Sequence, residues 1–251
     1  MPSARTRPAR PGEGARAPGR SARPLAPAAA LVLLALLAAH GAARASGPYR
    51  VDDAAITPAG GGQLETWVSL TRRGHAFEAL PATTLKALPF LEWSAGLDTG
   101  RFDGARTTGL TLQAKGLFGA EPATPGAVGF AASGAVRFGL DGAGATDLAL
   151  NGIMTLVASD RLLLHGNLGL AEDRLDGDSA LTWGARAEAA LLPGRLSIHA
   201  ELFGSTQTRA GFQLGLRPTI LDGAMDLELV FSRNLGDERE RWATMGFALR
   251  F

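Results

Sequence analysis

The sequence predicts an all-β protein, an antiparallel up-and-down transmembrane β-barrel of about twelve strands. Three observations support this fold class. The closing segment RWATMGFALRF places an apolar side chain at every second position. The same alternation recurs between turn-forming residues along most of the chain, and no stretch after residue 46 is apolar for long enough to form a spanning helix. A period of two puts alternate side chains on opposite faces, which is typical of barrel walls with lipid outside and a polar lumen inside.

The positions of the alternating segments predict the individual strands. The segment near 76–86 is the weakest, because Pro81 interrupts it. Without it the count would be odd, whereas single-chain bacterial barrels have an even number of strands. Ten strands is the alternative if two weak segments fail. We expect strands near residues 63–71, 76–86, 90–98, 106–118, 127–139, 146–158, 161–171, 180–192, 195–205, 210–219, 223–234 and 241–251.

The start of the chain has the composition of a leader rather than of a packed domain. An Arg- and Pro-rich stretch precedes an apolar run from Leu25 to Ala39, and Ala43-Arg44-Ala45 provides a small-x-small cleavage site. These three parts predict a secretory signal peptide over residues 1–45, with a retained single-helix anchor as the competing interpretation. Residues 46–62 would then form a periplasmic segment or a lumen plug, and residues 63–251 an outer-membrane barrel.

Charge and cysteine content narrow the functional classes. The leader holds seven of the 25 Lys and Arg residues and one of the 24 Asp and Glu residues, so 18 basic and 23 acidic side chains remain. The basic character of the whole chain therefore belongs to the leader, and nothing favours nucleic-acid binding. The chain has no cysteine, which excludes disulfides and thiolate metal sites.

The connections between the expected strands differ in length. Those after even-numbered strands include Ser159-Asp160 and Pro193-Gly194, which are very short. Those after odd-numbered strands, around residues 98–106, 171–179 and 234–241, are longer and polar. Short turns at one rim and long loops at the other are typical of outer-membrane barrels. The segment AEPATPGA, residues 120–127, is the exception, a long connection where a short one is expected.

The polar face of the strands collects charged side chains. An Arg or Lys facing lipid near the bilayer midplane costs about 2–4 kcal/mol, so these side chains are expected to face the lumen. Paired charges would plug the lumen, whereas unpaired rings would line a narrow passage. Small inward residues such as Gly129 and Gly184 favour the passage. The expected lumen-lining residues are Glu65, Glu92, Lys115, Arg137, Arg186, Glu188, His199, Glu201, Arg217 and Glu228.

Enzymatic chemistry has one candidate constellation. Ser197, His199 and Glu201 fall on one face of a strand at spacings of two, which invites a catalytic triad. Residues two apart on a strand are about 6.6 Å apart at the backbone, and a nucleophile must lie roughly 3 Å from its base. We therefore predict no catalytic residues. The histidines are too scattered for a metal site, and no sequence motif indicates a cofactor.

The closing strand carries a further signal. Phe247, Leu249 and Phe251 alternate up to an aromatic C-terminus, a pattern typical of the insertion signal of outer-membrane barrels. We expect this strand to close the barrel against the strand near residue 64, with Phe251 at the periplasmic rim. The expected partners are outer-membrane lipids, the barrel-assembly machinery and a small solute of unknown identity.

Several stretches of the mature chain resemble a known family. PYRVDDAAITPAGGGQLETW, LHGNLGL, LGLRPTI with MDLELVFS, and GFALRF resemble proteobacterial outer-membrane proteins named for the MetA pathway of phenol degradation and described as transporters. The resemblance implies export to the outer membrane, a barrel of about this size and no catalytic residues. The expected function is a narrow channel or transporter for small solutes, hydrophobic or aromatic ones among them. A barrel hydrolase and a closed structural or adhesive barrel are the alternatives.

Overall fold

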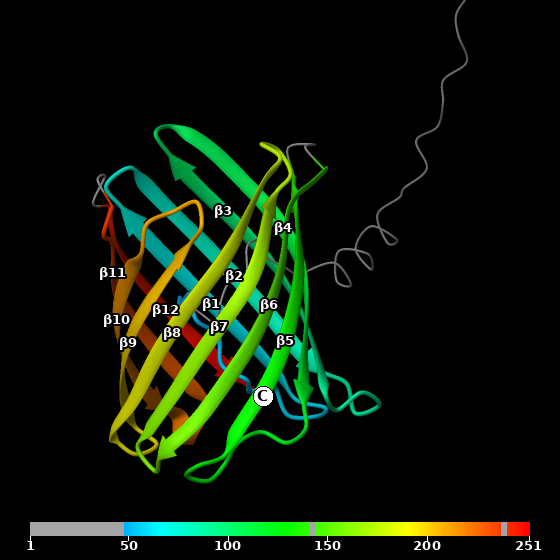
Figure 1. The fold of residues 1–251 in the computed structure, drawn as a ribbon, viewed down its shortest axis with the longest axis vertical. Helices are drawn as coiled ribbons and strands as arrows, with labels where there is room; N and C mark the ends of the chain where they lie inside the picture. Colours follow the sequence, from blue (N-terminus) through cyan, green and yellow to red (C-terminus); the bar gives the residue numbers. More distant parts are fainter. Residues whose placement is uncertain (1–47, 141–143, 237–239) are drawn as a thin grey trace, which may run out of the picture.

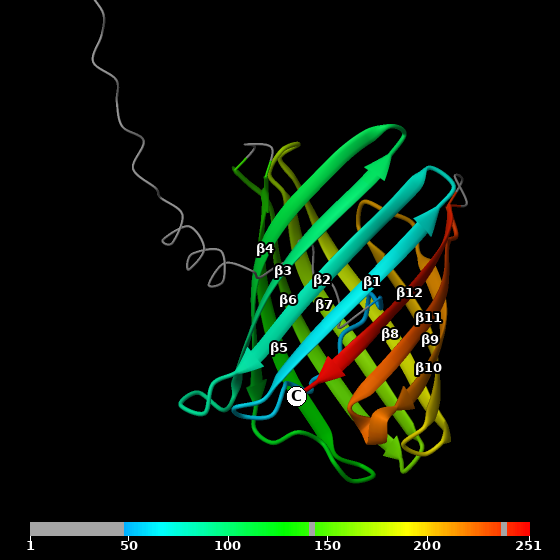
Figure 2. The ribbon, with the colours of Figure 1, turned by 180° about the vertical axis from the view of Figure 1, so that it is seen from behind.

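The computed structural model describes residues 48–140, 144–236 and 240–251. Within these residues the chain forms a closed barrel of twelve antiparallel strands that follow one another around the ring in sequence order. Figures 1 and 2 show the strands tilted around a common axis. This arrangement confirms the predicted fold class and the count of twelve. The predicted leader, residues 1–45, lies outside the described residues.

Each predicted strand corresponds to an observed one. Pro81 lies inside β2 and faces Leu64 of β1. On its other side the β2–β3 ladder passes from the Ala79–Leu97 pair directly to the Ala82–Ser94 pair, consistent with a proline that has no N–H to donate. The strands are β1 (Gly62–Thr71), β2 (Gly74–Thr84), β3 (Leu91–Phe102), β4 (Ala105–Phe118), β5 (Val128–Gly139), β6 (Gly144–Ser159), β7 (Leu162–Asp173), β8 (Asp178–Leu192), β9 (Leu196–Ser205), β10 (Gly211–Ile220), β11 (Met225–Asn234) and β12 (Arg241–Arg250), with a 3₁₀ turn, η1 (Leu221–Gly223), before β11.

The last strand closes the barrel as predicted. β12 pairs with β1 in antiparallel register, and Leu249 lies opposite Leu64. The backbones of Gly62 and Phe251 exchange two hydrogen bonds, with N···O distances of 2.7 and 2.9 Å. Both chain ends of the barrel therefore lie at one rim, called the C-terminal rim below, and the opposite end is called the far rim.

The predicted difference between the two rims holds only in part. β3 continues to Phe102 and β4 begins at Ala105, so the stretch expected to be a loop is a hairpin with a two-residue turn. Asp103 and Gly104 in this turn have φ values of 49° and 87°, the combination that suits tightly connected antiparallel strands. Polar strand ends continued to pair here, and the longest connection, residues 119–127, lies at the C-terminal rim.

The two faces of the wall differ in chemistry. On β9, Ile198 and Leu202 are exposed on the outside, whereas His199 and Glu201 are buried inside. Trp93 and Trp183 are 46% and 43% exposed and lie on the outer face, while Trp67 is 5% exposed and lies on the inner face. An outer surface so rich in exposed Leu and Phe requires a lipid environment. None of the described segments forms a helix suited to crossing a membrane.

Most of the described residues that precede β1 lie inside the barrel. Tyr49, Val51, Asp52 and Ala54 are almost fully buried. Figures 1 and 2 show this stretch, drawn in blue, within the ring of strands. Residues 48–57 are called the lumen segment below, and the exposed residues 58–60 lead from it to β1.

Candidate functional site in the barrel lumen

The lumen segment is held by side chains of the barrel wall. Four backbone N–H groups of the segment donate hydrogen bonds to inward side chains from four different strands. These bonds run from Arg50 to Glu201 (2.7 Å), Asp52 to Asn167 (2.7 Å), Ala54 to Thr155 (2.8 Å) and Thr57 to Glu92 (2.7 Å). The hydroxyl of Thr57 also donates to Glu92. Because buried backbone donors need partners, these wall side chains fix the path of the segment.

Two wall cations hold the acidic residues of the segment. Lys115 Nζ lies 3.0 Å from Asp52 Oδ1 and 3.7 Å from Asp53 Oδ1. Arg186 Nη2 lies 3.2 Å from Asp53 Oδ2. Burial by itself raises the pKa of Asp53, but the charges of Lys115 and Arg186 outweigh it and hold that pKa below its usual range. The segment is therefore docked in part by buried ion pairs.

Tyr49 anchors the start of the lumen segment. Its hydroxyl donates to Glu228 Oε2 at 2.9 Å, and its ring stacks on His199 with centroids 4.7 Å apart. The guanidinium groups of Arg186 and Arg217 lie 5.0 and 5.3 Å from the ring centroid. Burial, and then the negative charge of Glu228, raise the pKa of the Tyr49 phenol above its ordinary value.

Two inward glycines make room for the lumen segment. A Cβ at Gly215 would lie 2.8 Å from Cε1 and 3.0 Å from Cζ of Tyr49, and a Cβ at Gly184 would collide with Val51. From the sequence, small inward residues such as Gly184 were expected to leave an open passage. The structure shows that the space at Gly184 is filled by the chain's own segment.

The predicted lumen-lining residues fall into two groups. Most lie beside the lumen segment or beside residues that contact it, whereas Arg137 lies apart and pairs with Asp98 (2.8 Å) and Asp147 (3.5 Å). The buried ones are Glu65, Glu92, Lys115, Arg186, His199, Glu201 and Glu228, and the partly buried ones are Arg137, Glu188 and Arg217. Sequence reasoning gave no role to Tyr49, Asp52 or Thr155. The adjacent acids Asp52 and Asp53, together with the inward Lys and Arg of the wall, were the sequence signal that could have indicated this contact.

Two cavities lie at opposite ends of the lumen. The cavity at the C-terminal rim has a volume of about 580 Å³, and Asp53, Thr57 and Arg217 are among its lining residues. The cavity toward the far rim has a volume of about 560 Å³, and Arg50, Phe203 and Trp242 are among its lining residues. The lumen segment contributes to both linings, so it lies between the two cavities.

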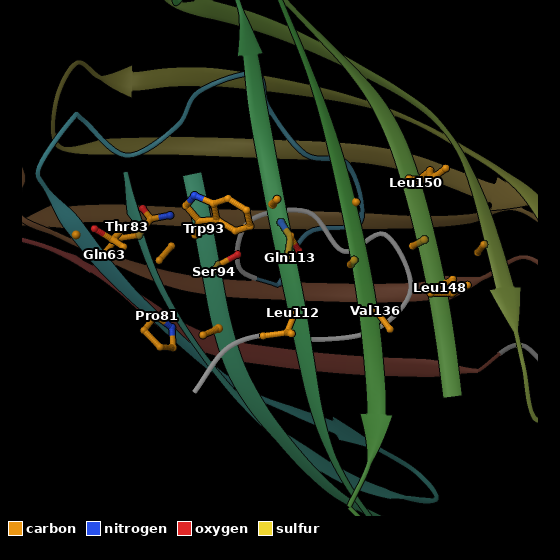
Figure 3. A pocket seen from close by; sticks show the side chains of 18 of the residues that line it. Gln63, Pro81, Thr83, Trp93, Ser94, Leu112, Gln113, Val136, Leu148 and Leu150 are labelled. Carbon is orange, nitrogen blue, oxygen red and sulfur yellow. The ribbon is translucent and has the colours of Figure 1, made fainter. Parts of the chain in front are cut away.

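A further hollow belongs to the outer wall. Its lining includes Trp93, Leu112 and Leu150, which point away from the lumen (Figure 3). Trp93 and Leu150 are exposed large apolar side chains of the lipid-facing surface. This hollow is therefore part of the membrane-facing surface and not of the lumen site.

The candidate triad is only partly assembled. Ser197 Oγ lies 2.9 Å from His199 Nε2, closer than the backbone spacing suggested. Glu201 instead accepts the N–H of Arg50, and the carboxylate near His199 Nδ1 belongs to Glu188, at 3.5 Å. The ring of Tyr49 lies against His199. Among the described residues, no three His, Asp or Glu side chains are grouped to hold a metal ion.

The closed twelve-stranded wall, apolar outside and charged inside, defines a transmembrane β-barrel with a porin-like fold. The chain belongs to the family described as "Uncharacterised conserved protein UCP029691", whose model matches residues 33–251. No curated protein sequence matches the chain.

Several solved structures share this fold at low sequence identity. The KdgM porin aligns with a TM-score of 0.59 at 10% identity, covering 75% of this chain and 99% of its own. The COG4313 outer membrane channel from Pseudomonas putida F1 also gives 0.59 at 10% identity, covering 78% and 97%. The NanC porin gives 0.52 at 9% identity, covering 74% and 98%. The family name taken from phenol degradation stays a prediction.

Proposed function

We propose that this protein is an outer-membrane channel for small solutes, and that the lumen segment controls passage through it. The position of the segment between two lumen cavities carries this proposal. The segment is attached to the wall mainly through side chains, each of which can be released without breaking the β-ladder. A plug held in this way can leave while the barrel stays closed.

The proposed location and orientation are supported by the outer surface and by the position of Phe251. The exposed apolar side chains of the outer wall support insertion into lipid. The fold shared with porins and with an outer membrane channel supports the outer membrane as that lipid phase. The C-terminal rim, which carries Phe251, would then face the periplasm, with Phe247, Leu249 and Phe251 presented to the assembly machinery.

The far-rim cavity supports the expected solute class in part. Phe203 and Trp242 line it, with ring centroids 6.3 Å apart. The guanidinium of Arg50 lies 5.8 and 5.9 Å from the centroids of these two rings. Flat aromatic surfaces beside a cation would retain small aromatic solutes at the entrance. Transport of such solutes remains part of the proposal.

A reversible crosslink tests the proposed control of passage. A Cβ built at Gly129 would lie 3.5 Å from the Cβ of Ala54, a distance that suits a disulfide. Pro122 crowds the same position, so the pair Ala54→Cys and Gly129→Cys is combined with Pro122→Ala. The chain has no other cysteine. In planar bilayers, the oxidised protein should show less conductance than the same protein after reduction.

The control is Pro122→Ala with Ala54→Cys alone, which cannot form the crosslink and should not respond to reductant. Discrete conductance in the reduced protein, with suppression on oxidation, supports a channel controlled by the segment. A bilayer that stays closed in both redox states would contradict the channel and favour a structural or adhesive barrel. Equal conductance in both states would contradict control by the segment.

A further inference from the structure

The wall around Arg50–Ala54 binds a peptide segment of the chain itself. The N–H groups of Arg50, Asp52 and Ala54, at every second residue, are each accepted by a wall side chain. Asn167 also donates its Nδ2 to the carbonyl of Asp52 at 2.9 Å, so one amide side chain satisfies both backbone groups of that residue. The wall therefore recognises the backbone of the lumen segment through side chains, as a receptor recognises a peptide.

The same wall selects acidic side chains. Lys115, only 3% exposed, is within ion-pair distance of both Asp52 and Asp53. Arg186 uses Nη2 for Asp53, while its Nε and Nη1 are buried and have no hydrogen-bond partner among the described residues. A guanidinium with two unused donors has capacity for a further carboxylate oxygen. A carboxylate that takes the place of Asp53 can therefore find further donors on Arg186.

The wall carboxylates distinguish a peptide from a simple anion. Glu201 and Glu92 point at the segment and accept the N–H groups of Arg50 and Thr57. A dicarboxylate without amide groups would bring its charge toward these acids and offer them no donor, which is unfavourable. A peptide offers carboxylates to the two cations and N–H groups to the two acids. The chemistry of the whole site thus matches an acidic peptide.

We propose that this lumen site binds short acidic peptides, and that Asp52 and Asp53 occupy it as an internal competitor. This inference rests on the proposed channel function, in which the lumen segment can leave the site, and it names a solute class for that channel. A peptide with adjacent Asp residues would take the place of Asp52 and Asp53 beside Lys115 and Arg186.

Calorimetric titration of the full-length protein in detergent tests the site. The probe is N-acetyl-Asp-Asp amide, and the control probe is N-acetyl-Asn-Asn amide. The double variant Asp52→Asn/Asp53→Asn should bind the acidic probe at least about tenfold more tightly than the wild type, because the internal competitor has lost its charge. Addition of Lys115→Met should remove this gain. Arg137 pairs with Asp98 and Asp147 of the wall, so addition of Arg137→Gln should leave the gain in affinity unchanged.

The outcomes separate the two proposals. Equal binding of the acidic and amide probes, absence of binding to the double variant, or binding unaffected by Lys115→Met would each overturn the peptide site. Heat of binding requires no conduction. Selective peptide binding by a protein that never conducts would therefore support the site and overturn the channel, whereas conductance without selective binding would do the reverse.

Discussion

Replacement of Lys115 by Met should release the lumen segment. Lys115 and Asp52 are both almost fully buried and lie 3.0 Å apart, and Lys115 also pairs with Asp53. Removing one partner of a buried ion pair costs about 3–5 kcal/mol, because the remaining charge is left uncompensated. At 1.4 kcal/mol per factor of ten, the ratio of docked to released segment should fall roughly a hundred- to several-thousand-fold. Met retains an unbranched apolar side chain, so the wall keeps most of its packing.

Tyr49 provides the assay, because it is the only tyrosine in the chain. While the segment is docked, burial and Glu228 raise the pKa of its phenol, whereas a released phenol titrates near its ordinary value of about 10. Phenolate absorbance followed against pH should therefore shift downward in Lys115→Met, and the conductance should rise in parallel.

The matched control for Lys115→Met is Arg137→Gln, which removes a lumen cation paired with Asp98 and Asp147. This variant should keep the raised pKa of Tyr49. If Lys115→Met also kept the wild-type titration and the wild-type conductance, the ion pairs would not be what docks the segment, and the reasoning would be refuted.

Two further predictions concern the same segment. Gly215→Ala places a methyl group about 2.8 Å from the Tyr49 ring and should lower the pKa of Tyr49 toward its ordinary value, whereas Gly152→Ala, whose Cβ would have 3.5 Å to its neighbour, should not. Conductance should also depend on pH at both extremes. The released phenol ionises above about pH 10 while the docked one keeps its proton, so docking weakens as the pH rises beyond that value. The pKa of Asp53 is lowered on docking, so its contribution is present above about pH 4 and is lost as the pH falls further. A conductance that stayed constant from strongly acidic to strongly alkaline pH would contradict both assignments.

Most of the barrel could be predicted because the wall obeys one local rule. The period of two reports directly which side chains face lipid, and it located all twelve strands to within a few residues. The rule failed at the far rim, where polar residues around Asp103 and Gly104 suggested a loop. Polarity indicates contact with water, but a strand that projects beyond the lipid is also polar. The tight Asp-Gly turn was the signal that the hairpin continued.

The lumen site could be predicted only as a set of candidates. The cost of placing charge in lipid assigns Lys115, Arg186 and Glu201 to the inside of the barrel, but it does not say what these side chains contact. Their partners lie far away in the sequence, and Arg50 and Glu201 are separated by 151 residues. The lumen segment has no periodic pattern, because it is bound through side chains from several strands rather than through a ladder. The pattern of alternating residues therefore could not predict the structure of the segment that occupies the lumen.

The number of strands alone does not decide whether such a barrel conducts. Eight strands enclose a space that side chains fill, and sixteen leave a water-filled channel, so twelve strands enclose an intermediate space. Here Gly184 and Gly215 face inward, so the wall places no side chain in the space beside them. Val51 and Tyr49 of the lumen segment fill that space. A barrel that only needed to be solid could fill the same space with larger side chains at these two positions and would not require a separate segment. Glycines paired with a removable filler are what a channel with a movable plug needs, because the space becomes available as soon as the segment leaves.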